Sequence, residues 1–240
     1  MNGGSNAPAS PSKIDVWGYN TIAKQVISPI ILGGLLFWLA GTTDWTWGWV
    51  FNIVHTLAWV MMTVMVWRAN PELLNVRGKL QSGAKRWDRI LLSIYGIAWI
   101  VMIILGGLDA RYGWTPAIPS FWYVVGNGLV LFGFFVTSWA MAVNRNFEVE
   151  VRIQEDRGHK VATGGPYRFV RHPGYTGVII AFYFGMPLAL GSIPAFIAGL
   201  FGLVTMVIRT RMEDDTLQKE LPGYRDFTRQ TRYRLLPGVW

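Results

Sequence analysis

The sequence contains no cysteine, and only 15% of its 240 residues are charged. Without cysteine the chain can form neither a disulfide nor a thiolate metal site, and cysteine usage says nothing about its redox compartment. Its three histidines, His55, His159 and His172, do not have the spacing of a zinc site, so we expect no metal. The sequence also shows no internal repeat and no second soluble domain.

Apolar residues are abundant instead: they make up 52% of the chain, which includes 13 Trp. They occur in long uninterrupted runs, which is typical of membrane proteins. We expect six spans, at Val26–Thr42, Trp45–Trp67, Ile90–Leu108, Phe121–Val143, Tyr175–Leu190 and Ile193–Ile208. Because the last two are short for a full crossing, five spans are the alternative. The predicted fold is an all-α, polytopic membrane helical bundle.

Positive charge is distributed unevenly. With six spans, all but one of the 22 Lys and Arg residues fall on one side of the membrane, and Arg111 is the exception. Since Lys and Arg accumulate in cytoplasmic loops, both termini and every large polar segment are expected to be cytoplasmic. Trp residues near the span ends are interpreted as interfacial anchors, so the net charge of +8 does not predict nucleic-acid binding.

Three regions follow from this pattern. Residues 1–25 form a polar N-terminal segment whose first dozen residues, rich in Asn, Gly, Ser and Pro, are expected to be disordered. Residues 26–119 hold the N-terminal transmembrane helices. Residues 120–240 form a membrane core with a cytoplasmic loop and a cytoplasmic C-terminal helix and tail.

The stretch Gln154–Tyr175 is the longest polar passage between apolar spans. Pro173 disfavours the α region at His172, so a helix is expected to begin directly after an extended His172. Free N–H groups at a helix start favour an anionic ligand. Gly164-Gly165-Pro166 predicts a turn that folds the loop back over this helix end. The alternative is a basic loop that only joins two spans.

A second polar cluster follows Ile208. The last span is expected to continue into the cytosol until Pro222-Gly223, which places Arg209 and Glu213 on one helix face. Arg209 is expected at the hydrocarbon boundary, where ionisable groups are costly and often functional, although a solvated helix end would look the same. The tail from Tyr224 to Trp240 resembles an amphipathic element lying on an anionic lipid surface.

The motifs G-G-P-Y-R-F-V-R-H-P-G-Y-T-G, R-x-R-x-E-D-D, G-Y-x-x-F and L-L-P occur in this order. Over roughly residues 120–240 they resemble the isoprenylcysteine carboxyl methyltransferase family, which are integral membrane enzymes that use S-adenosylmethionine. The N-terminal half matches only as generic membrane helices. The resemblance implies that Arg209 and Glu213 are catalytic. It implies a cofactor site made of Gln154, His159, Lys160, Val161, Ala162, Tyr167, His172, Pro173, Gly174, Tyr175 and Glu213.

The expected activity is methyl transfer from S-adenosylmethionine to a lipophilic small molecule or lipidated substrate, such as the carboxylate of an isoprenylcysteine. A carboxylate is ionised at neutral pH and needs no base. A thiol or phospholipid-amine acceptor on the same scaffold would need one, with Glu213 or His172 as the candidates. A sterol-reductase-like NADPH enzyme, a transporter and a purely structural membrane protein are the other classes left open.

Overall fold

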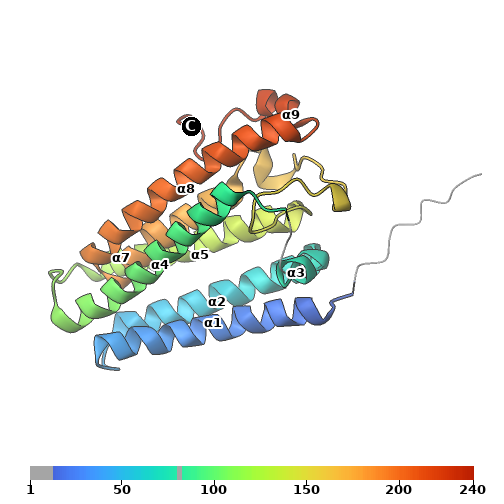
Figure 1. The fold of residues 1–240 in the computed structure, drawn as a ribbon. Coiled ribbons are helices and arrows are strands. Elements are labelled where there is room, and N and C mark those ends of the chain that lie inside the picture. Colours follow the sequence, from blue (N-terminus) through green and yellow to red (C-terminus); the bar gives the residue numbers. More distant parts are fainter. Residues whose placement is uncertain (1–12, 80–82) are drawn as a thin grey trace, which may run out of the picture.

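The computed structural model describes residues 13–79 and 83–240, and the first dozen residues, expected to be disordered, lie outside the described residues. Long helices run side by side and form an elongated bundle (Figure 1). Six segments are long and apolar enough to cross a membrane: α1 (Val16–Ala40), α2 (Thr46–Ala69), α4 (Arg86–Tyr112), α5 (Ser120–Val143), the segment Pro173–Leu190, and α8 (Ile193–Glu220). The predicted six-span helical bundle is confirmed.

The surface of the bundle is that of an integral membrane protein. Trp38 and Phe201, for example, are 74% and 71% exposed on the outer faces of α1 and α8. Contiguous apolar surface of this kind would be costly in water and is compatible with lipid. The exposed apolar faces are therefore those of helices that lie in a membrane.

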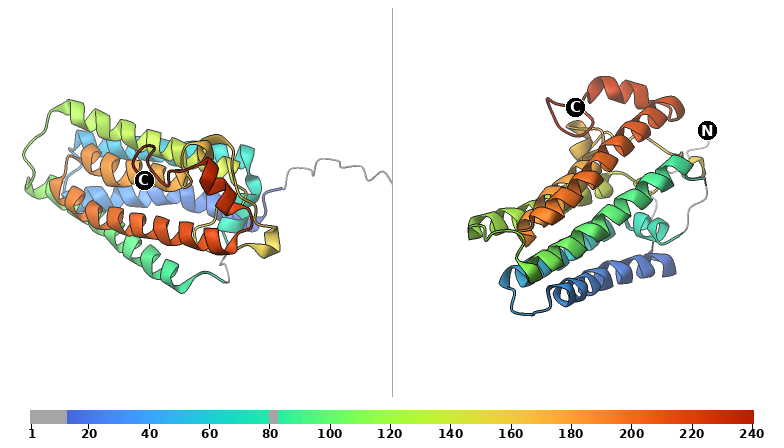
Figure 2. Two further views of the ribbon diagram at one scale, coloured as in Figure 1. Left: turned by 90° about the horizontal axis from the view of Figure 1, so that it is seen from above. Right: turned by 60° about the vertical axis from the view of Figure 1, so that its left-hand side comes forward.

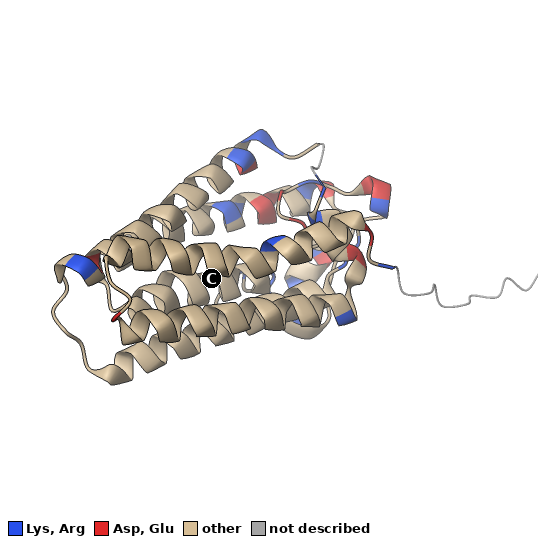
Figure 3. Cartoon of the chain, turned by 90° about the horizontal axis from the view of Figure 1, so that it is seen from below, with Lys and Arg blue, Asp and Glu red and all other residues tan. Residues whose placement is uncertain are grey.

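The short elements gather at one end of the bundle (Figures 1 and 2). They are α3 (Pro71–Arg77), the 3₁₀ turns η1 (Glu155–Arg157) and η2 (Gly165–Arg168), and α9 (Tyr224–Gln230). Figure 3 shows that most charged residues lie at this same end, with few at the opposite end. We call it the charged end.

The first helix begins earlier than predicted. Asp15 caps it, because its carboxylate accepts bonds from the N–H groups of Trp17 and Gly18 at 2.9 and 3.0 Å. Residues 16–25, expected to belong to a polar lead-in, therefore form its first turns. Their polar side chains contact α3. For example, the Thr21 hydroxyl donates a hydrogen bond to the Leu74 carbonyl at 2.9 Å. Hydropathy missed these turns because they pack on protein at the charged end.

The fifth span is composite. It consists of α6 (Pro173–Val178), a π-helical segment, Ile179–Gly185, and α7 (Met186–Leu190). Its first part lies unusually close to α5, since a Cβ at Gly133 would lie 2.4 Å from the Gly177 carbonyl oxygen. Small residues of this kind let two membrane helices approach backbone to backbone. The contact fixes α6 against α5, and α6 begins where the polar stretch Gln154–Tyr175 ends.

The end of the chain packs against the bundle. As expected, α8 continues to Glu220 and stops before Pro222-Gly223. Tyr224 and Phe227 of α9 are buried, and the backbone N–H groups of Arg171 and His172 each donate at 2.9 Å to carbonyls of the tail. Leu236 and Val239 remain exposed, and contact of the tail with a lipid surface stays a prediction.

Candidate active site

Two cavities meet at the charged end. The polar pocket lies between residues 144–162, the start of α6 and the last turns of α8. The apolar cavity, of about 290 Å³, is enclosed by the spans beside it. Its wall is largely aromatic, from Trp59, Trp99, Phe134 and Phe182, with Met62, Met141 and Met206. Phe147, Glu148, Tyr175 and Arg209 line both cavities and so form a shared wall.

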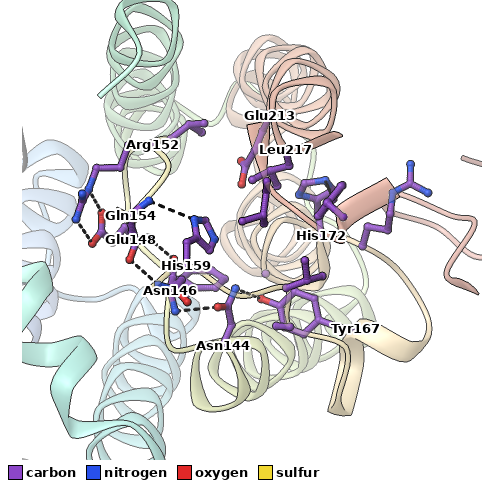
Figure 4. Close-up of a pocket in the computed structure, with 18 of the residues that line it drawn as sticks. Asn144, Asn146, Glu148, Arg152, Gln154, His159, Tyr167, His172, Glu213 and Leu217 are labelled. Carbon is purple, nitrogen blue, oxygen red and sulfur yellow. Dashed lines mark hydrogen bonds and ion pairs between the residues drawn. The ribbon is translucent and has the colours of Figure 1, made fainter. Parts of the chain in front are cut away.

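The loop on one side of the polar pocket is held by its own side chains (Figure 4). The Gln154 amide donates to the Asn146 carbonyl at 2.7 Å, and its oxygen accepts from the Asn146 amide at 2.9 Å. Glu148, nearly inaccessible, accepts two bonds from Arg152 at 2.7 and 2.9 Å. The 3₁₀ turn after Gln154 ends at Gly158, whose φ of 58° is left-handed. This turn brings His159 back beside Gln154.

His159 is neutral in this loop. Burial, together with the positive charges of Arg152 and Arg157, lowers its pKa to about 4. The neutral ring accepts a long bond of 3.4 Å from the Gln154 backbone N–H through Nδ1. The ring therefore supports the turn that carries Lys160, Val161 and the rest of the pocket-lining segment.

The opposite side of the pocket is built on the start of α6. His172 is the N-cap residue and Pro173 the first helical residue, as predicted, although the φ and ψ of His172 (−123° and 59°) are not fully extended. The His172 ring stacks on that of Tyr175, with centroids 5.6 Å apart. The Tyr175 hydroxyl donates a short hydrogen bond to Glu213. Sequence positions 38 residues apart thus form one face of the pocket.

Asp214, directly after Glu213, was missed by the sequence analysis. It is fully buried, and it accepts bonds from Arg171 at 2.7 and 2.9 Å and from the Tyr224 hydroxyl at 2.9 Å. Nε2 of His172 lies 3.2 Å from it, and Arg234 donates to it at 2.9 Å. The available signal was the run Glu213-Asp214-Asp215: successive helical residues point about 100° apart, so one carboxylate faces the pocket and the next the interior.

Arg209 was expected at the hydrocarbon boundary. Its side chain is instead buried within the protein. It is 4% exposed, and its Nε donates to the Asp88 carboxylate at 2.7 Å and one terminal nitrogen to the Val149 carbonyl at 2.6 Å. Its guanidinium lies over the Tyr175 ring, 4.9 Å from the centroid. Unpaired, this charge would be costly to bury, so α4 supplies Asp88 from the other half of the chain.

The structure brings nearly all of the predicted site residues together. The polar pocket is lined by Gln154, His159, Lys160, Val161, Ala162, Tyr167, His172, Gly174, Tyr175, Arg209 and Glu213. Pro173 is the exception: it is buried in the first turn of α6 and shapes that turn without lining the pocket. That these residues bind a cofactor stays a prediction. Among the described residues no cluster of His, Asp and Glu is suited to a metal ion.

The chain is similar to known membrane methyltransferases in its C-terminal half. The model of the phospholipid methyltransferase family matches residues 121–222. A probable protein-S-isoprenylcysteine O-methyltransferase from Oryza sativa is 37% identical over 68 residues, which are 27% of this chain and 36% of that protein. Protein-S-isoprenylcysteine O-methyltransferase B from Arabidopsis thaliana is 26% identical over 89 residues, or 36% of this chain and 44% of that protein.

The predicted resemblance to the isoprenylcysteine carboxyl methyltransferase family is confirmed. A solved structure of the eukaryotic intramembrane Ras methyltransferase ICMT (isoprenylcysteine carboxyl methyltransferase) aligns with a TM-score of 0.52 and 14% identity, over 88% of this chain and 74% of that one. This likeness shows the fold. The chain matches less than half the length of the two plant relatives, so the local similarity does not extend over whole proteins.

Proposed function

We propose that this protein is an integral membrane methyltransferase that moves a methyl group from S-adenosylmethionine to a lipophilic acceptor carboxylate, such as that of an isoprenylcysteine. The observation that carries the proposal is the shared wall. A pocket suited to a polar cofactor and a cavity suited to an apolar tail meet at Tyr175 and Arg209. The names of the plant relatives support the same acceptor class.

The polar pocket fits the proposed cofactor by its chemistry. Glu213 supplies a carboxylate for hydroxyl or ammonium groups, and Tyr167 and Tyr175 supply rings for a purine. The Lys160 ammonium suits the carboxylate of the cofactor. When bound, the cofactor supplies an electrophilic methyl group on a sulfonium. Gln154, whose amide is already bonded to Asn146, is assigned to holding the loop.

The surroundings favour an acceptor that needs no deprotonation. His172 is engaged with Asp214 and Tyr224, and Glu213 already accepts a bond from Tyr175. A thiol or protonated amine would require one of these groups to leave its present contact and act as a base, whereas a carboxylate requires neither. For a carboxylate the protein's main task is to position the acceptor, and the apolar cavity with its aromatic side chains suits an acceptor's apolar tail.

A phospholipid amine is the second candidate, because the matching family model is that of phospholipid methyltransferases. The test uses the purified protein in lipid nanodiscs with a methyl-labelled donor and acceptors that share one farnesyl tail but end in a carboxylate, thiol or amine. We expect base-labile label, the signature of an ester, on the carboxylate only. Label on the amine or thiol alone would refute carboxylate transfer, and label on none, without donor binding, would refute the methyltransferase assignment.

The orientation is part of the proposal: the charged end is assigned to the cytoplasm. Because the chain has no cysteine, single cysteines can be introduced at Thr163 and Ala117, which lie in exposed loops toward opposite ends of the bundle. An impermeant thiol reagent should label Thr163→Cys only from the cytoplasmic side and Ala117→Cys only from the other. The reverse pattern would invert the topology.

A further inference from the structure

Arg77 is the last residue of α3, and its side chain lines the apolar cavity. The side chain forms no hydrogen bond and no ion pair with any other described residue. Arg77 is partly buried, so its guanidinium loses part of its hydration and gains no ion-pair partner among the described residues.

The carboxylate that attracts Arg77 is bonded to other residues. Glu148 attracts Arg77 electrostatically, but the Glu148 carboxylate is occupied by two bonds from Arg152 and a longer contact of 3.5 Å with Arg157. Burial lowers the pKa of Arg77 to about 10, with Glu148 acting in the opposite direction, so the guanidinium remains charged at neutral pH.

Arg209, the other cation of the same cavity, is differently placed. Its Nε and one terminal nitrogen are bonded to Asp88 and to the Val149 carbonyl. The planar fork that recognises carboxylates in two-point fashion is thus already used within the protein. The guanidinium of Arg77, in contrast, has all of its donors available.

We propose that Arg77 binds the carboxylate of the acceptor and selects anionic amphiphiles over neutral ones of the same shape. The inference rests on the proposed function and names a specificity-determining residue for it. The apolar tail occupies the cavity among Trp59, Trp99 and Phe182, and the head group lies at the charged end beside the shared wall. Arg77 lies outside residues 121–222, so this element of the site comes from the other half of the chain.

The test measures binding without the methyl donor. Calorimetry in phosphatidylcholine nanodiscs compares N-acetyl-S-farnesylcysteine with its neutral methyl ester, with empty nanodiscs as the blank. The wild-type protein should bind the acid at least about tenfold more tightly than the ester. Arg77→Gln should lose about tenfold in affinity for the acid, about 1.4 kcal/mol, and keep its affinity for the ester. Arg68→Gln removes the same charge from an exposed site of α2 and should change neither affinity.

Thermal unfolding supplies the second readout. Because Arg77→Gln removes an unpaired charge, the variant should melt at or above the wild-type temperature. The inference is overturned if the variant binds the acid normally, loses acid and ester alike, or unfolds at a clearly lower temperature. An equal loss in Arg68→Gln would also overturn it. If Arg77→Gln methylates the acid with an unchanged KM, only this inference fails; if the wild type neither binds donor nor methylates, the proposed function fails instead.

Discussion

Two carboxylates at the charged end are completely buried, Asp214 and Asp88, and they connect different parts of the molecule. All side-chain partners of Asp214 lie within residues 171–234. Asp88, on α4, binds Arg209 of α8 and the Val151 N–H at 2.7 Å, and so joins the two halves of the chain. One carboxylate organises the C-terminal half, and the other attaches it to the N-terminal half.

The cavities follow the same division. Within the described part of the chain, the polar pocket is lined by residues from 144 to 227, whereas the apolar cavity takes wall residues from α1, α2, α3 and α4 as well. The comparison implies a division of work, in which the C-terminal half binds the donor and both halves bind the acceptor.

Replacing Asp214 should disrupt the C-terminal half as a whole. Asp214→Asn leaves Arg171 and Arg234 without their buried counter-charge, which typically costs about 3–5 kcal/mol. We expect a large drop in the chemical-denaturation midpoint and loss of donor binding. Asp215→Asn, at the adjacent and 47% exposed side chain, is the control and should leave both unchanged. Equal stability of the two variants would remove Asp214 from its organising position.

Filling the apolar cavity from the N-terminal half should affect the acceptor alone. Gly96 of α4 lines this cavity, and a Cβ added there meets nothing within 4 Å, so Gly96→Leu projects into free space. The acceptor KM should rise about tenfold, roughly 1.4 kcal/mol, and the donor affinity should not change. Gly34→Leu, at an exposed and equally open position of α1, is the matched control. A loss of donor affinity in Gly96→Leu would break the proposed division.

The sequence predicted some features of the molecule better than others. Features set by neighbouring residues were predictable, and those set by contacts between distant residues were not. The six spans were predictable because hydropathy is a local property, and the α6 start because Pro173 acts on its neighbour. The Arg209–Asp88 pair joins positions 121 residues apart, so no local pattern predicted that Arg209 would be buried. Arg77 was missed for the same reason: α3 became part of the cavity only when the spans assembled.

The tail shows a different limit of sequence reasoning. Its pattern of apolar and basic residues suits a helix on a lipid surface and equally a segment that packs on protein. The buried contact of Tyr224 with Asp214 shows that part of this apolar face covers protein, and this contact depends on the fold. Amphipathic spacing predicts that one face is buried, but it does not say whether lipid or protein covers it.

Neutralising Glu213 should affect donor binding moderately. In Glu213→Gln a charge-assisted contact with the cofactor becomes a neutral one, a difference of about 1 kcal/mol. Donor affinity should fall roughly fivefold, and the binding of an acceptor analogue should be unaffected. Glu220→Gln makes the same change two turns further along α8, where the carboxylate pairs with Lys85 at 2.7 Å, and should have no effect on the donor. If Glu213→Gln instead weakens only acceptor binding, its assignment to the donor side is wrong.

The smallest effect should come from His159, which tests whether the loop of the polar pocket opens independently of the N-terminal half. Its pKa is lowered to about 4 in the closed loop, whereas in an open loop it should approach the ordinary value of about 6.5. The open state therefore binds more protons between these values, and the free energy of opening should fall as the pH is lowered from about 6.5 to about 4, then level off.

Hydrogen exchange, corrected for the pH dependence of the intrinsic rate, should show this loss of protection around Gln154 and His159. The backbone of α2 should not share it. His159→Asn keeps a possible acceptor for the Gln154 N–H but cannot titrate in this range, so it should abolish the pH dependence. The same pH dependence in α2 would mean that the two halves open together and that the division drawn from Asp214 and Asp88 does not extend to dynamics.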